Sequence, residues 1–128
     1  MVALFATDDL HHARFDATLR RLAKEGLRLL STWPCVVEAS CLLDAPHRFE
    51  LLRWIELGAV QMVPFAAHDL ADIVPWMRTY TDRKREMDLA DASLYWLAVQ
   101  TGVRRVLTVD EADFSRYRLP DGKRFEIL

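Results

Sequence analysis

The chain has 128 residues and a mass of 14.8 kDa, which is the size of one ordinary domain. Hydrophobic residues make up 52 % and charged residues 28 %, with only 4 glycines and 5 prolines, so disorder and collagen-like or low-complexity repeats are excluded. The net charge of -2 creates no overall positive field, so any nucleic acid would have to be held by a local basic face or by metal ions.

The first half of the chain predicts alternating helices and strands. A short apolar segment (2–6) stops at Thr7-Asp8-Asp9, a composition typical of a helix N-cap region. Apolar residues then recur with helical periodicity until Gly26, which is suited to end a helix. The expected elements are helices over residues 11–25, 34–43 and 46–57, and strands over residues 27–33 and 60–65.

The second half continues the alternation. A helix is expected over residues 69–84, with a kink or a restart at Pro75, and a second helix over 87–100. The remaining expected elements are strands over 105–110 and 124–128 and a helical turn over 111–117. Helices alternating with short strands favour an α/β fold, in which a parallel sheet is covered by helices on both faces.

The sequence gives no sign of a membrane segment. No apolar run approaches the roughly 20 residues of a membrane-spanning helix, and no basic region precedes an apolar stretch at the start. Cys35 and Cys41 are too few for a disulfide framework and suit a reducing compartment. The expectation is a cytoplasmic protein without a membrane partner, in which the cysteines are small apolar residues of a buried segment.

Five acidic residues stand in unusually apolar or closely spaced positions: Glu38, Asp88, Asp91, Asp110 and Asp113. Asp88 and Asp91 point from the same side of a first helical turn, and Asp110 ends an apolar strand. Ligands of parallel sheets bind beyond the carboxyl ends of the strands, and converging carboxylates repel one another unless a cation such as Mg²⁺ joins them. The simpler alternatives are that Asp88 caps its helix and that Asp113 caps the turn before Phe114.

These residues, in this order, resemble the PIN domain family, and specifically the VapC-type toxins of toxin–antitoxin systems. The most specific part is Met87-Asp-Leu-Ala-Asp-Ala-Ser-Leu, followed by Thr108-Val-Asp-Glu-Ala-Asp-Phe. Thr32-Trp-Pro with Val37-Glu-Ala, and Asp9 with His11-His12-Ala-Arg, extend the resemblance over essentially the whole chain. The resemblance implies one domain over residues 1–128 with a three-layer α/β fold. It also implies an endoribonuclease dependent on Mg²⁺ or Mn²⁺, which forms a homodimer and is inhibited by a cognate VapB-like antitoxin.

The resemblance also assigns roles to individual residues. Glu38, Asp91 and Asp110 match the family's conserved catalytic acids, and Asp88 and Asp113 match auxiliary acids of the metal site. Basic residues beside these acids are candidates to steer RNA phosphates, although such a run is also typical of a solvated helix end. The RNA-binding candidates are Arg83, Lys84, Arg85 and Arg116.

One part of the family pattern is missing. Members begin with a strand that ends in an aspartate, whereas Met1-Val-Ala-Leu-Phe resembles the helix that follows that strand. Three explanations stay open: a start downstream of the true one, a strand supplied by another chain, or a sheet closed around the loss. The alternative function is therefore a catalytically impaired or inactive PIN-fold module that acts through antitoxin binding or oligomerisation.

Overall fold

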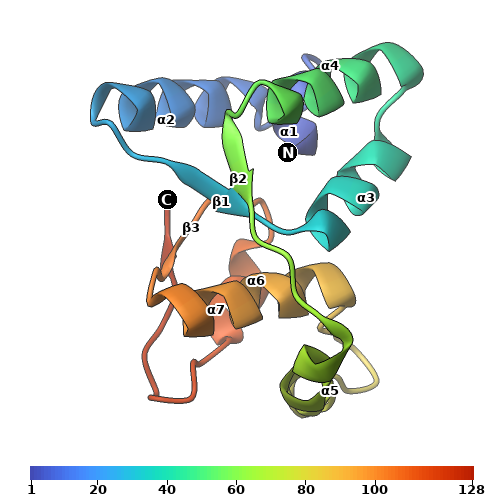
Figure 1. Ribbon diagram of the computed structural model, residues 1–128, viewed down its shortest axis with the longest axis vertical. Coiled ribbons are helices and arrows are strands. Elements are labelled where there is room, and N and C mark those ends of the chain that lie inside the picture. Colours follow the sequence, from blue (N-terminus) through green and yellow to red (C-terminus); the bar gives the residue numbers. More distant parts are fainter. The chain divides into compact units, whose positions relative to one another are not determined.

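The computed structural model describes all residues from Met1 to Leu128 and divides into two compact units. The N-terminal unit is Met1–Val63 and the C-terminal unit is Pro64–Leu128. Figure 1 labels all of their α-helices and the strands β1, β2 and β3.

The N-terminal unit contains four helices and one pair of strands (Figure 1). The three helices and two strands that the pattern of residues predicts occur in the expected order, and the short helix α1 is the one that only the family resemblance suggests. Its elements are α1 (Val2–Phe5), α2 (His12–Lys24), β1 (Leu29–Ser31), α3 (Trp33–Leu42), α4 (Ala45–Glu56) and β2 (Val60–Met62).

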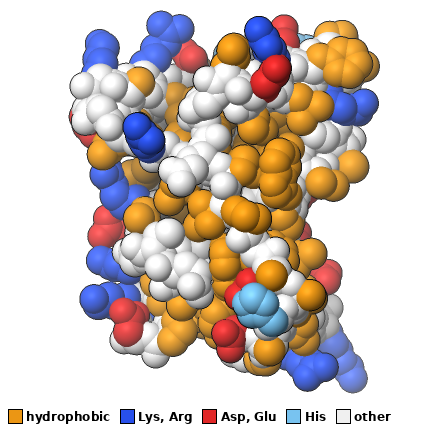
Figure 2. Space-filling view, in the orientation of Figure 1, with side chains coloured by type: hydrophobic (Ala, Val, Ile, Leu, Met, Phe, Trp, Pro, Cys, Tyr) orange, Lys and Arg blue, Asp and Glu red, His pale blue; other side chains and the backbone are white.

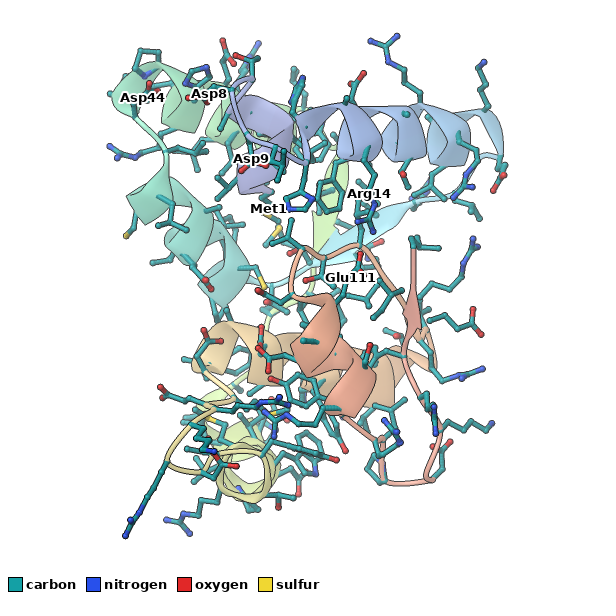
Figure 3. All side chains as sticks on the ribbon, turned by 180° about the vertical axis from the view of Figure 1, so that it is seen from behind. Met1, Asp8, Asp9, Arg14, Asp44 and Glu111 are labelled. Atoms are coloured by element: carbon teal, nitrogen blue, oxygen red, sulfur yellow. The ribbon has the colours of Figure 1, made fainter.

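Apolar side chains from α1, α3 and α4 form one core cluster of this unit. Ala39, Leu43 and Leu51 are buried, and Phe5 packs edge-on against Trp54 with ring centroids 5.5 Å apart. The side chain of Asp44, labelled in Figure 3, accepts a hydrogen bond from the backbone N–H of His47 and so caps the start of α4.

The strands β1 and β2 form a parallel pair in which Leu29 lies opposite Val60 and Ser31 opposite Met62. The pair ends quickly because Thr32 already takes the N-cap position of α3, and Pro34 then fixes the helical start. The expected strands over 27–33 and 60–65 are therefore present but shorter.

The C-terminal unit has the same alternation. Its elements are the 3₁₀ turn η1 (Ala67–Asp69), α5 (Leu70–Thr79), α6 (Leu89–Thr101), β3 (Arg105–Val106), α7 (Glu111–Arg116) and β4 (Glu126–Ile127). Helix α5 runs through Pro75 but ends at Thr79, well before residue 84, so the predicted extent of this helix is wrong. None of the helices in either unit combines the length and the apolar character that crossing a membrane requires.

Helix α6 and a cluster of aromatic rings form the core of the C-terminal unit. Most of α6 from Ala90 to Ala98 is buried, and its apolar residues leave no polar face. The hydroxyls of Tyr80 and Tyr95 both donate hydrogen bonds to the backbone carbonyl of Arg118, which ties the segment after α7 to this core.

The expected three-layer α/β fold, with one parallel sheet covered by helices on both faces, is wrong. More than half of the residues are helical, and the strands form two separate two-stranded parallel sheets, β1–β2 and β3–β4. Each strand has one partner and is two or three residues long, so no strand is central. Alternation along the chain predicts parallel neighbours, but it does not determine how many strands join one sheet.

The cysteines also differ from expectation. Both are free, but Cys41 is exposed and Cys35 is only partly buried. The face of α3 that carries Cys41 also exposes Val37, so this apolar helix is not buried on all sides as its composition suggests.

Candidate functional site

Asp88 forms the N-cap of α6. Its extended backbone, with φ -74° and ψ 176°, lets the side chain turn back, and Oδ1 accepts a 2.8 Å hydrogen bond from the backbone N–H of Asp91. The alternative that Asp88 caps its helix is therefore confirmed. The cap also brings a negative charge to the helix turn that holds the Asp91 carboxylate.

Asp91 is the most perturbed acid of the C-terminal unit. Its half-buried side chain has a pKa raised to about 7, chiefly because burial disfavours the ionised form. The charges of Asp88, Asp110 and Asp113 raise this pKa further, whereas a hydrogen bond from Tyr117 lowers it. Acids from the start of α6 and from the start of α7 thus act on one carboxyl group.

Tyr117 is the site residue that the sequence does not single out. Its side chain is fully buried just after α7, and its hydroxyl donates a 2.8 Å hydrogen bond to Oδ2 of Asp91. Burial and this hydrogen bond to a carboxylate raise the pKa of Tyr117 above its usual value. The available signal was its spacing of three residues from Phe114, which places it on the buried face, where a tyrosine hydroxyl needs a partner.

Asp110 and Asp113 lie at the start of α7, whose first residue, Glu111, is labelled in Figure 3. Asp110 occupies the N-cap position without a side-chain cap, and its backbone N–H donates to Thr108 Oγ1 at 3.0 Å. Burial, followed by the charges of Asp113 and Asp88, raises the pKa of Asp110. Asp113 lies inside the first turn, 3.6 Å from an Arg116 nitrogen, so the expectation that Asp113 is a cap is wrong.

The donor chemistry of these four aspartates fits a hard divalent cation. Carboxylate oxygens are the ligands that Mg²⁺ and Mn²⁺ prefer, and a cation would relieve the repulsion that raises the pKa of Asp91. In their present rotamers, no three acidic, histidine or cysteine side chains of the C-terminal unit form a group that could hold a metal ion. Binding would therefore require side-chain rotation by at least one of the exposed aspartates.

Glu38, the fifth predicted metal ligand, belongs to the N-terminal unit. It lies exposed on α3, among the side chains around the amino group of Met1. Burial lowers the pKa of that amino group, and the charges of Cys35, Asp9 and Glu38 partly offset the shift; Met1 and Asp9 are labelled in Figure 3. The site described above is therefore built from the four aspartates alone.

The basic candidates fall into two kinds. Arg83, Lys84 and Arg85 are exposed in the loop between α5 and α6, where Asp82 accepts hydrogen bonds from the backbone N–H groups of Lys84 and Arg85. Arg116 is instead used within the unit, because its guanidinium donates to the carbonyl of Tyr80 at 3.0 Å. Its guanidinium carbon also lies 5.7 Å and 5.3 Å from the ring centroids of Tyr80 and Tyr117.

Comparison of the sequence with protein-family models finds no match, and comparison with curated proteins finds none either. The resemblance to the VapC-type toxins therefore stays a prediction that rests on the motif residues.

Proposed function

We propose that this chain is a metal-dependent endoribonuclease of the VapC toxin type, which hydrolyses RNA phosphodiester bonds. One observation carries the proposal: the half-buried Asp91 carboxyl group, held by the hydroxyl of Tyr117 at 2.8 Å, lies among the charges of Asp88, Asp110 and Asp113, which together with burial raise its pKa to about 7. Such an arrangement opposes folding at neutral pH, and strongly perturbed acids of this kind cluster at functional sites.

The proposal assigns metal-binding and RNA-binding roles to different residues of the chain. Asp91 and Asp110 supply carboxylate oxygens, and Asp88 and Asp113 add negative charge beside them. Bound Mg²⁺ or Mn²⁺ would supply an activated water and offset charge on the phosphate. The exposed cations Arg83, Lys84 and Arg85, in the loop that leads into Asp88, attract the RNA backbone.

A titration with Mn²⁺ tests the metal site without knowledge of the RNA target. We expect the chain to bind Mn²⁺ and the Asp91→Asn and Asp110→Asn variants to bind it more weakly. Asp72→Asn is the matched control, because Asp72 is an exposed acid of α5 whose charge does not contribute to the pKa of Asp91. Equal affinity in all four proteins would contradict the proposed site.

Cleavage of RNA is the direct test of the activity. A fluorescently labelled oligoribonucleotide of random sequence, incubated with the chain and Mn²⁺, should be cut, and the Asp91→Asn variant should not cut it. Cleavage that is unchanged in Asp91→Asn, or that persists in excess EDTA, would overturn the assignment as a metal-dependent nuclease.

The second candidate is a non-catalytic module of the same family that acts by binding a VapB-like antitoxin or a second copy of itself. The solvent-facing side of α3 favours it, because Val37 and Leu42 remain 60 % and 68 % exposed. Figure 2 shows hydrophobic side chains gathered over α3 and the adjoining end of α4, where Phe49 is 66 % exposed. Exposed apolar surface of this kind is typical of a protein-binding face.

Sedimentation velocity separates the two candidates when it is read beside the Mn²⁺ titration. A homodimer that Val37→Lys dissociates, in a protein that binds no Mn²⁺, would favour the module. Mn²⁺ binding with cleavage of RNA would favour the enzyme, whatever the oligomeric state.

A further inference from the structure

We infer that Tyr117 is a positioning residue for Asp91: its hydroxyl holds one carboxylate oxygen so that the other is presented to a cation. This inference rests on the proposed function, because it assigns Tyr117 a role at the same metal site. The two atoms concerned are Tyr117 Oη and Asp91 Oδ2, which lie 2.8 Å apart.

The ring of Tyr117 has little freedom to move. It is fully buried and packs edge-on against Tyr80 and Phe114, with ring centroids 5.0 Å and 5.2 Å away. The guanidinium carbon of Arg116 lies 5.3 Å from the centroid of the same ring. Because these contacts fix the ring, the position of the hydroxyl is also fixed. The Asp91 side chain must therefore adopt a rotamer that brings its carboxylate within hydrogen-bond distance of that hydroxyl.

The hydrogen bond makes the two oxygens of the Asp91 carboxylate different from each other. Oδ2 accepts from Tyr117, whereas no hydrogen bond to Oδ1 accompanies it. A buried hydroxyl without a partner is costly, so Tyr117 favours the one Asp91 rotamer that satisfies it. The oxygen that Tyr117 does not occupy is then the one available to bind a cation, as in metal sites where a hydrogen-bonded ligand is held in orientation by its partner.

The other tyrosines of the chain do not share this role. The chain has three, and the hydroxyls of Tyr80 and Tyr95 both donate to the backbone carbonyl of Arg118, which is a neutral partner. Only Tyr117 places its hydroxyl on a carboxylate. Tyr95 is therefore a matched control, since it is also a buried tyrosine of the same unit whose hydroxyl is hydrogen bonded.

The experiment measures the affinity for Mn²⁺ by the loss of the free-ion electron paramagnetic resonance signal. Tyr117→Phe keeps the ring and its packing but removes the donor, and we expect it to weaken Mn²⁺ binding by about 10- to 100-fold, the usual effect of losing a partner that orients a metal ligand. Tyr95→Phe should leave the affinity unchanged. In the Asp91→Asn background, Tyr117→Phe should cause no further loss. Urea unfolding of each variant without metal shows that the comparison is made on folded protein.

Each outcome decides between the two proposals. Weaker binding in Tyr117→Phe and Asp91→Asn, but not in Tyr95→Phe, supports both. Binding that Asp91→Asn weakens and Tyr117→Phe leaves unchanged keeps the proposed function and overturns the role of Tyr117. Equal weakening by Tyr117→Phe and Tyr95→Phe overturns it as well, because a general loosening of the aromatic core would then explain the effect. No Mn²⁺ binding by the unmodified chain overturns both.

Discussion

The hydroxyl of Tyr117 donates a 2.8 Å hydrogen bond to Asp91, joining the residue that follows α7 to the first turn of α6 across 26 positions of the chain. This hydrogen bond favours the ionised form of Asp91. Burial and the charges of three aspartates oppose that form more strongly and raise the pKa to about 7. Tyr117 thus fixes the position of the Asp91 carboxyl group, while burial and the neighbouring charges disfavour its ionised form.

Asp91 should make the protein less stable as the pH rises. An unfolded aspartate ionises near pH 3.8, whereas the folded one ionises near 7, so the advantage of the protonated folded form is complete below pH 3.8 and is lost as pH rises through 7. With allowance for the partial exposure of the side chain, we expect the free energy of unfolding to fall by about 2 kcal/mol over this window. Urea unfolding from pH 4 to 8 in EDTA checks this, with Asp91→Asn giving a flatter curve and greater stability at pH 8. A wild-type curve that rises between pH 5 and 7 more than that of the variant would contradict the raised pKa.

The affinity for Mn²⁺ should increase as the pH rises, whereas the free energy of unfolding should decrease. A cation binds the ionised carboxylate, so below the pKa of about 7 each binding event must displace a proton from Asp91. Affinity should therefore fall by up to about tenfold for each pH unit below 7 and level off above it. Titration calorimetry in two buffers of different ionisation enthalpy measures the proton released. A release near zero at pH 6 would show that Asp91 is not a ligand.

The sequence predicts local structure well because local signals determine it. Gly102, with φ +73°, ends α6 close to the expected residue, and Asp88 begins α6 as an N-cap. The number of strands in a sheet depends instead on pairing between distant segments. The alternation of helices and strands therefore predicted one larger parallel sheet, whereas the structure has two two-stranded sheets. The sequence predicts all five acids from their apolar neighbours or their spacing, and four of them, Asp88, Asp91, Asp110 and Asp113, interact in the C-terminal unit. Tyr117 was missed because a tyrosine near a helix end is ordinarily a core residue.

Substitutions at Asp88 should separate capping from electrostatics. Asp88→Asn keeps a side-chain oxygen for the N–H of Asp91 and removes the charge, so the pKa of Asp91 should fall while α6 stays capped. Asp88→Ala removes both and should lower the free energy of unfolding by about 1 kcal/mol relative to Asp88→Asn. Carbon-13 NMR of the Asp91 carboxyl group and urea unfolding give the two readouts. If the pKa of Asp91 does not change in Asp88→Asn, the two carboxylates do not interact.

Arg116 should stabilise the C-terminal unit rather than bind RNA. Its guanidinium donates to the carbonyl of Tyr80 and lies over two tyrosine rings, while its Nε and Nη2 atoms are buried without a hydrogen bond. The 3.6 Å separation of Nη2 from Asp113 is an ion pair only, so the carbonyl and the rings provide the specific geometry. Arg116→Ala should cost about 1–3 kcal/mol of unfolding free energy. Arg116→Lys should recover only part of it, because an ammonium cannot reproduce the planar contact. If Arg116→Ala is as stable as the wild type, Arg116 is free to bind RNA instead.

The loop before α6 should bind RNA by charge alone. Arg83, Lys84 and Arg85 are exposed, and Asp82 fixes the turn through the N–H groups of the last two, so substituting their side chains leaves those backbone hydrogen bonds in place. The triple change Arg83→Ser, Lys84→Ser and Arg85→Ser should weaken binding of a labelled oligoribonucleotide and reduce the slope of log Kd against log salt by up to about three. Stability and Mn²⁺ affinity should not change.

The control replaces Arg20, Arg21 and Lys24 of α2 by Ser, which removes the same charge from an exposed helix surface in the N-terminal unit. Equal weakening by the two triple variants would mean that RNA senses only net charge, whereas weakening confined to residues 83–85 would identify this loop as the RNA-binding face.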